Sequence, residues 1–141
     1  YIKLYDYKWY IVVSPDNCLA CRPYITVRDL ANQKIIMPED EIHDYKQLMQ
    51  AIPPEDHPEF ILTGEHLFDI VHQMIIANNA VMICATPHVS LLNPSVLKAV
   101  PFYTDLLRSK IYLLSKRGEA LSPVADMAKK YLLDAWGFST R

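Results

Sequence analysis

Residues 59–84 have the sequence EFILTGEHLFDIVHQMIIANNAVMIC, and the pattern of apolar residues in this stretch decides the fold class. Residues 59–62 predict a short strand, and residues 65–77 predict a helix because their apolar side chains recur at helical spacing. The pair Asn78-Asn79 can end that helix in the left-handed conformation, and residues 80–84 predict a second, buried strand. A strand, a helix and a strand in this order are typical of a parallel βαβ unit.

The same alternation of strands and helices precedes this unit. Residues 7–13, YKWYIVV, are rich in aromatic and β-branched side chains and predict a strand that the turn residues 14–17 stop. Residues 34–37 predict a short strand that Pro38 ends, and residues 42–51 predict a helix from their apolar spacing. We therefore expect an α/β fold in which a mainly parallel sheet is flanked by helices.

A capping signal marks a helical turn between these two strands. Thr26 stands three positions before Asp29, and this Thr-x-x-Asp pattern approximates a capping box. The pattern predicts that a short helical turn occupies residues 27–32.

The last third of the chain predicts two more strands and a helix. Residues 96–100 and 110–115 have strand-like sequences, and residues 116–118 form a turn. Ser122-Pro123 predicts the start of a final helix, because proline is favoured at the first helical position. We expect this helix to run to about Trp136.

The composition excludes several classes of protein. Of the 141 residues, 51% are apolar and 21% are charged, values typical of a folded globular protein and not of a disordered one. Fourteen Lys and Arg against sixteen Asp and Glu give a net charge of -2, which argues against a polybasic nucleic-acid surface within these residues. With only three glycines, the chain can form neither a P-loop nor a dinucleotide-binding fingerprint.

The sequence also indicates in which cellular compartment the protein is expected. It has no apolar run near the roughly 20 residues that cross a bilayer, so we expect no transmembrane helix and no membrane partner. No signal peptide opens the chain, which begins with Tyr1 and not with Met, so we expect a fragment of a longer protein. The odd cysteine count of three favours a reducing cytoplasm.

Three stretches follow one another in an order found in a known family. They are YDYKWYIVVSPDNCLACRPYITVRDLANQKIIMPED at residues 5–40, HLFDIVHQMIIANNAVMICATP at residues 66–87 and YLLSKRGEALSPVADMAKKYLLDAW at residues 112–136. Together they resemble the C-terminal effector-binding domain of LysR-type transcriptional regulators. The chain departs from the family pattern at Asn78-Asn79, where the family usually has glycine; asparagine still tolerates the positive φ of such a turn.

The resemblance implies a fold of the periplasmic-binding-protein type II class. Residues 1–100 would form the second, effector-binding regulatory subdomain, and residues 101–141 would return as a strand and the C-terminal helix of the first. The implied function is sensing of a small-molecule effector for a bacterial, cytoplasmic transcription regulator, with DNA bound only through an N-terminal helix-turn-helix that is not in this chain. A solute-binding protein of a transporter shares the fold and stays the alternative; it would need a secretory signal upstream.

The candidate effector site follows from the strand ends. Open parallel sheets bind ligands outside the carboxyl ends of their strands, and in the family these ends match the second-subdomain wall of the effector cleft. A structural interpretation stays open for each residue, because prolines can merely stop strands and Thr63 can merely cap a helix. The candidate effector-binding residues are Met37, Pro38, Thr63, Gly64, Thr86 and Pro87.

Each type of residue in this set suggests a role. Thr63 and Thr86 would donate hydrogen bonds to the effector. Gly64 would let the effector approach the backbone, and Met37 would supply adaptable apolar contact. Nearby acidic residues would repel an anion, which favours a neutral or cationic effector; they are Glu39, Asp40, Glu41 and Glu65.

Cys18-Leu19-Ala20-Cys21 is the sharpest isolated motif. A CxxC pair can be a redox pair or half of a zinc site, but no second CxxC or HxxxH follows to complete a metal site. In the family resemblance the motif falls in a variable loop, so a motif without function also stays open. A redox function predicts a thiolate with a lowered pKa, which iodoacetamide labelling would detect. The third cysteine, Cys84, lies in a predicted buried strand, where it acts as a small apolar residue.

The chain offers no complete set of catalytic side chains, so we predict no enzymatic activity, no cofactor and no metal. His66 and His72 lie six positions apart, on different faces of the predicted helix. Asp69 and His72 are neighbours at i, i+3, an arrangement more typical of surface pairing than of catalysis. Ser122 lacks the Gly-x-Ser-x-Gly context of a nucleophile. The other histidines are scattered: His43, His57 and His88.

An apolar face near the C-terminus predicts self-association. If residues 101–136 lack the strands on which they would pack, their apolar side chains stay exposed, and exposed apolar patches drive association. In the family, dimers form through helices and strands of the two subdomains, so we expect a homodimer or a higher oligomer. The residues concerned are Leu113, Ala128, Tyr131, Leu132, Ala135 and Trp136.

Overall fold

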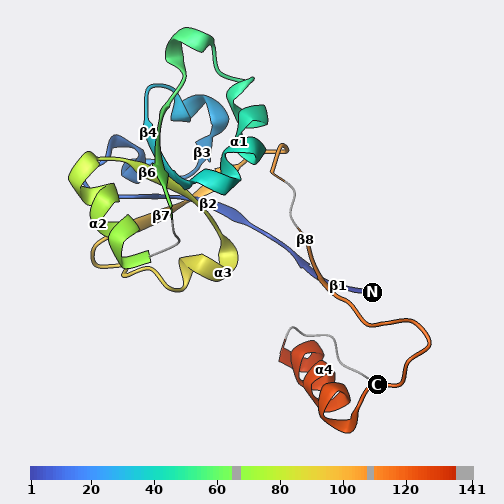
Figure 1. The fold of residues 1–141 in the computed structure, drawn as a ribbon. Helices are drawn as coiled ribbons and strands as arrows, with labels where there is room; N and C mark the ends of the chain where they lie inside the picture. Colours follow the sequence, from blue (N-terminus) through green and yellow to red (C-terminus); the bar gives the residue numbers. More distant parts are fainter. Residues whose placement is uncertain (65–67, 108–109, 136–141) are drawn as a thin grey trace. The chain divides into compact units, whose positions relative to one another are not determined.

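The computed structural model describes residues 1–64, 68–107 and 110–135, and the chain divides into two compact units (Figure 1). One unit, here called the sheet unit, is Lys8–Leu107, and the other, the terminal unit, combines Tyr1–Tyr7 with Arg108–Arg141. The predicted helix start at residues 65–67 and the predicted helix end at Trp136 lie outside the described residues.

The sheet unit is built on a six-stranded mixed sheet with the strand order β3-β7-β2-β6-β4-β5. Strands β4, β5 and β6 are parallel neighbours, as the alternation of strands and helices predicted, and β3 is parallel to β7. The strands are β2 (Trp9–Val13), β3 (Ile25–Thr26), β4 (Lys34–Pro38), β5 (Glu59–Thr63), β6 (Val81–Ala85) and β7 (Lys98–Tyr103).

Strand β2 runs antiparallel to both of its neighbours, which differs from a simple series of parallel βαβ units. Trp9 pairs with Ala85 of β6 and with Phe102 of β7, so the start of β2 lies level with the ends of these two strands. The reason is connectivity: the chain enters the sheet unit at Lys8, at the edge where the other strands end. The prediction that residues 7–13 and 80–84 share one sheet is confirmed.

Alternating residues of the strands build two separate cores, one on each face of the sheet. Ile11 and Val13 pack with α1 (Ile42–Met49) on one face, whereas Val12 packs with α2 (Phe68–Asn78) on the other. Figure 1 shows these two helices on different sides of the sheet. The fold is therefore the expected α/β arrangement of a sheet flanked by helices, although the sheet is mixed and not mainly parallel around β2.

Short helical segments connect the longer elements. The helical turn predicted after Thr26 is the 3-10 helix η2 (Val27–Leu30), and the positive φ of 47° at Asn79 confirms the left-handed end predicted for the central helix. The remaining short segments are η1 (Cys18–Cys21), η3 (Glu39–Glu41), η4 (Pro54–Asp56) and α3 (Thr86–Val89).

The terminal unit contains a two-stranded antiparallel ribbon and one helix. Strand β1 (Ile2–Asp6) pairs with β8 (Lys110–Leu113), and α4 spans Pro123–Ala135. The Ser122 hydroxyl accepts a hydrogen bond from Ala125 N–H at 3.2 Å and caps this helix, which begins at the predicted Pro123. None of the helices in the described ranges has the length and apolar character that a membrane span requires.

Candidate functional site

The carboxyl ends of β4, β5 and β6 lie at one edge of the sheet, as expected for parallel neighbours. Pro38 of β4 pairs with Thr63 of β5, and β6 lies on the other side of β4 and ends immediately before Thr86. We call this the carboxyl edge and define it by Pro38, Thr63, Gly64, Thr86 and Pro87. The sheet topology thus brings together the strand ends from which the candidate residues were chosen.

Thr63 and Gly64 form the outermost corner of the carboxyl edge. The Thr63 hydroxyl lies 3.4 Å from the carbonyl oxygen of Met37, to which it donates a hydrogen bond. Gly64 is exposed, and a Cβ added to it would meet no atom within 4 Å. Gly64 is therefore not required by the packing of its own chain, and the space in front of it is open.

Thr86 binds the backbone of Lys8 at the start of β2. Its Oγ1 accepts a hydrogen bond from Lys8 N–H at 2.9 Å and donates one to the Lys8 carbonyl at 2.9 Å. The Thr86 N–H donates to the same carbonyl at 2.9 Å. These bonds join the end of β6 to the start of its antiparallel neighbour.

The two threonine hydroxyls therefore already donate their protons within the protein. A hydroxyl supplies one donor and two acceptor lone pairs, so a ligand at this edge meets lone pairs on Thr63 and Thr86 unless it displaces these internal bonds. Donation by the threonines, the role expected from the sequence, requires such a displacement.

The other candidate residues differ in how far they reach the surface. Met37 is only 3% exposed and belongs to the core under α1, so its side chain packs inside the protein. Pro38 and Pro87 are half-buried, and the Pro87 carbonyl accepts a hydrogen bond from the Ser90 hydroxyl at 2.9 Å. The accessible part of the carboxyl edge thus consists mainly of threonine, proline and glycine.

Acidic side chains follow the carboxyl end of β4. Glu39 and Asp40 are exposed, and Glu41 is half-buried, all in η3 directly after Pro38. Glu65, the fourth acidic residue in the expectation, lies outside the described residues. The acidic turn next to the edge opposes binding of an anion at the end of β4.

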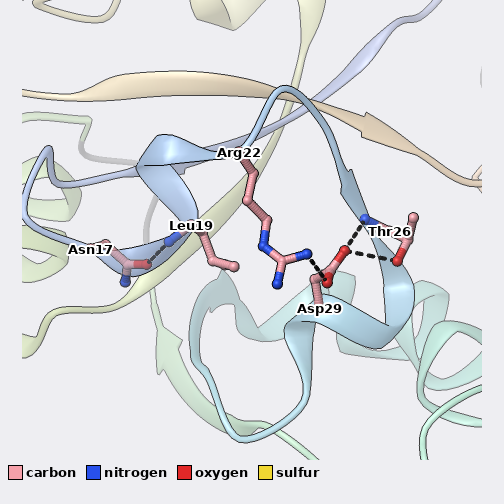
Figure 2. A network of polar contacts seen from close by, with 5 residues as sticks. All are labelled: Asn17, Leu19, Arg22, Thr26 and Asp29. Carbon is pink, nitrogen blue, oxygen red and sulfur yellow. Dashed lines mark hydrogen bonds and ion pairs between the residues drawn. The ribbon is translucent and has the colours of Figure 1, made fainter.

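A polar network orders the segment that leads into η2, at the β3 end of the same sheet edge (Figure 2). Asp29 Oδ2 accepts hydrogen bonds from the N–H and the hydroxyl of Thr26, each at 2.8 Å, and Asp29 Oδ1 pairs with Arg22 Nη1 at 2.6 Å. Burial by itself raises the pKa of the Asp29 carboxyl, but the two Thr26 bonds and the Arg22 charge together lower it below its ordinary value. The carboxylate therefore stays charged and holds Thr26 in place.

Three residues at this edge were not predicted from the sequence. Lys8 lies there because β2 is antiparallel, and Thr26 lies there because β3 pairs with the end of β7 at Tyr103. Thr104 follows β7, and its Oγ1 accepts a hydrogen bond from Leu106 N–H at 3.1 Å. The Thr-x-x-Asp pattern was the only signal for any of them, and it indicated a cap and not a site.

The described part of the chain contains no cluster of three or more His, Cys, Asp or Glu residues that could hold a metal ion. Cys18 and Cys21 are exposed and free, and Cys84 is buried. His66 and the side chains of His43 and Asp69 lie outside the described residues.

A mixed sheet with helices on both faces and three parallel strand ends at one edge is the arrangement of the periplasmic-binding-protein type II-like fold. The chain belongs to the LysR substrate binding domain family, whose model matches residues 1–137. This match confirms the resemblance drawn from the three sequence stretches. No curated protein matches the chain significantly.

Solved structures of LysR-type regulators have the same fold. The regulatory domain of Synechocystis CcmR, in complex with 2-PG, has a TM-score of 0.71 at 16% identity, over 96% of this chain and 65% of that one. The effector binding domain of QuiR, in complex with shikimate, has a TM-score of 0.65 at 17% identity, over 95% of this chain and 63% of that one. Full-length OxyR from Pseudomonas aeruginosa has a TM-score of 0.64 at 15% identity, over 95% of this chain and 46% of that one. This chain therefore spans between about half and two thirds of the proteins it resembles.

Proposed function

We propose that this chain is the effector-sensing part of a bacterial LysR-type transcription regulator, and that its effector binds at the carboxyl edge. The observation that carries the proposal is the parallel arrangement of β4, β5 and β6, which gathers three strand ends at one edge in a chain of the LysR substrate binding domain family. Residues 1–100 would supply the effector-binding subdomain, and residues 101–141 would supply the returning strand and helix.

The chemistry of the edge supports a neutral or cationic effector. The hydroxyls of Thr63 and Thr86 present acceptor lone pairs, and the acidic turn at Glu39–Glu41 adds negative charge beside them. Met37 contributes to this site through its carbonyl, which holds Thr63, and Gly64 leaves room for close approach of the ligand. A ligand rich in donors, such as an amine or a polyol, fits these groups best.

The role proposed for the chain is regulatory and not enzymatic. DNA binding would belong to a separate helix-turn-helix domain, the regulator would act in the cytoplasm, and two or more copies would associate. A solute-binding protein of a transporter has the same kind of fold, but the family match favours the regulator.

A ligand screen with matched variants tests the proposal. Thermal unfolding of the chain is measured with a panel of amines, amino acids, polyols, carboxylates and sugar phosphates, each in turn. A ligand present at 100 times its Kd stabilises the folded state by about 2.7 kcal/mol, which is easily detected. We expect the responding compounds to be neutral or cationic.

Gly64→Ala is the most informative variant, because the open space around Gly64 predicts unchanged folding. If the ligand contacts this position, the added methyl group lowers its affinity at least about tenfold, or about 1.4 kcal/mol. Thr63→Ala should weaken binding by about fivefold through one lost hydrogen bond. Lys34→Ala, at the opposite end of β4, is the control; equal ligand shifts in all of these variants would place the site elsewhere.

A further inference from the structure

Two exposed thiols lie on one turn of helix in the sheet unit. Cys18 and Cys21 are the first and last residues of η1, and both are exposed and free. A 3-10 helix has three residues per turn, so side chains at positions i and i+3 project in the same direction. In an ideal 3-10 helix the two side chains therefore project from the same side of η1, and both cysteines are exposed.

The spacing of this turn is close to that of a disulfide. At a rise of about 2.0 Å per residue, Cα atoms three positions apart are about 6 Å apart, within the range of about 4.4–6.8 Å found across disulfides. The two Cβ atoms of a disulfide are about 3.5–4.5 Å apart. This is shorter than the about 6 Å that separates side chains at i and i+3 along a 3-10 helix. Closing the bond therefore requires one end of η1 to move toward the other.

The first part of η1 is fixed and resists that movement. Asn17 is 3% exposed, and its Oδ1 accepts a hydrogen bond from Leu19 N–H at 2.9 Å. Leu19 and Ala20 are buried, and the Lys98 ammonium donates to the Ala20 carbonyl. At the other end, the Arg22 N–H donates to the Leu19 carbonyl at 3.2 Å, so closing the disulfide would strain this bond as Cys21 adjusts.

Cys21 is followed directly by Arg22, which is tied to the β3 end of the sheet edge. Arg22 pairs with Asp29 at 2.6 Å, and Asp29 holds both the N–H and the hydroxyl of Thr26 (Figure 2). A displacement of Cys21 would therefore move Arg22, and the Arg22–Asp29 ion pair would transmit this movement to the carboxylate that holds Thr26.

We propose that Cys18 and Cys21 form a reversible disulfide, and that its formation loosens the contacts of Asp29 with Arg22 and Thr26. The oxidant is a low-molecular-weight disulfide such as oxidised glutathione. The thiolate of one cysteine attacks it and releases one glutathione thiolate, and the second cysteine then displaces the other. The protein loses two electrons and two protons, and one glutathione disulfide becomes two thiols. Formation of the protein disulfide does not depend on the proposed function, whereas an effect on effector binding would rest on it.

The test equilibrates the 141-residue chain with mixtures of reduced and oxidised glutathione, blocks free thiols of the folded chain with excess iodoacetamide near neutral pH, where thiolates react, and then measures the mass. We expect a species that has lost two hydrogen atoms, with an effective concentration for the second exchange step of at least about 1 mM. Cys84 is the internal reference, because burial raises the pKa of its thiol to about 11, and it should be alkylated only after unfolding.

Two single variants separate a disulfide between the two cysteines from independent oxidation. Cys18→Ser and Cys21→Ser should each give only a mixed disulfide with glutathione, easily reversed by reduced glutathione. If the unmodified chain also accumulates mixed disulfides and no internal one, the proposed disulfide is refuted.

Amide hydrogen exchange tests the connection to the sheet edge without any effector. In the oxidised chain, the Thr26 N–H should exchange at least about threefold faster than in the reduced chain, because the carboxylate that accepts its hydrogen bond has moved. The amide of Leu48, in the core of α1, should be unchanged. Equal exchange at Thr26 in both forms would refute the connection to Asp29, and neither outcome depends on whether an effector binds.

Discussion

The Thr86 side chain makes hydrogen bonds with both backbone polar groups of Lys8, each at 2.9 Å. This pairing joins the end of β6 to the residue that precedes β2, which is also the residue at which the chain enters the sheet unit. Thr86 therefore has a structural role that is independent of any ligand, and a variant that removes its hydroxyl tests folding before it tests binding.

Thr86→Val should destabilise the protein because it keeps the shape of the side chain but removes both hydroxyl bonds to Lys8. A neutral hydrogen bond contributes about 1 kcal/mol, and the Lys8 backbone can regain bonds with water, so we expect a loss of about 1–2 kcal/mol in the free energy of unfolding. Urea denaturation measures it. Thr86→Ser retains the hydroxyl and is the control; equal midpoints for Val and Ser would show that the bonds contribute nothing.

Asn17 should contribute more, because it is buried and uses both ends of its amide. Its oxygen caps η1 at Leu19 N–H, and its nitrogen donates to Asn79 Oδ1 at 3.1 Å and to the Asn79 carbonyl at 3.4 Å. We expect Asn17→Ala to lower the free energy of unfolding by about 2–3 kcal/mol. Asn17→Asp retains the capping oxygen but turns a buried carboxylate oxygen toward two acceptor oxygens of Asn79, so a loss at least as large as for Ala is expected. A change below about 0.5 kcal/mol for Ala would contradict this assignment.

The strands could be predicted from the sequence wherever their pattern is local. β4 and β5 were predicted to within one residue, because runs of β-branched and aromatic side chains bounded by proline or glycine identify a strand without its partners. The direction of β2 could not be predicted, because it depends on where the chain enters the sheet. The strand predicted at residues 7–13 begins two residues before β2, and β1 (Ile2–Asp6) was not predicted, since no glycine, proline or asparagine marks the break at Tyr7 and Lys8.

The candidate site was predictable to a similar extent. Strand ends at Pro38, Thr63 and Thr86 were identified, because parallel neighbours end at the same edge. The burial of Met37 depends on which face of β4 lies under α1, and that requires the register of the whole sheet. The Arg22–Asp29 pair spans seven residues across a turn, so no local spacing rule predicts it.

Asp29 should make the stability of the protein depend on pH in the acid range. Because the folded-state pKa of Asp29 is lowered below 3.8, its contribution is fully present above the unfolded-state pKa. The contribution is lost as the pH falls through the folded-state pKa, where the carboxyl takes up a proton in both states. Compared with Asp29→Asn, the unmodified protein should be more stable by about 1 kcal/mol at pH 6. Urea unfolding between pH 6 and pH 2 should show this difference shrinking toward acid.

Arg22→Gln serves as the matched variant for that measurement. It removes the ion pair but leaves both Thr26 bonds to Asp29, so it should retain part of the pH dependence. A difference between Asp29→Asn and the unmodified protein that is the same at every pH would show that ionisation of Asp29 does not stabilise the fold.

Helix α4 exposes a stripe of large apolar side chains on one face. Val124, Met127 and Tyr131 are 72%, 67% and 74% exposed, and their spacing of three and four residues places them on the same side of the helix. Of the residues expected to form an exposed apolar face, Leu132 is 36% exposed, whereas Leu113 is half-buried. Trp136 lies outside the described residues. Leu133, on the other side of α4, is 5% exposed.

This stripe should drive association of the chain with itself, since large exposed apolar side chains lower their free energy by leaving water. We expect sedimentation velocity at tens of micromolar to show a dimer or a larger species. The double variant Met127→Glu and Tyr131→Glu places two charges on the stripe and should weaken association at least about tenfold, while circular dichroism shows that the helices persist. Lys129→Glu changes charge on the opposite side of α4 and should leave association unchanged. A clean monomer of the unmodified chain, or equal association in the double variant, would show that α4 does not carry the contact.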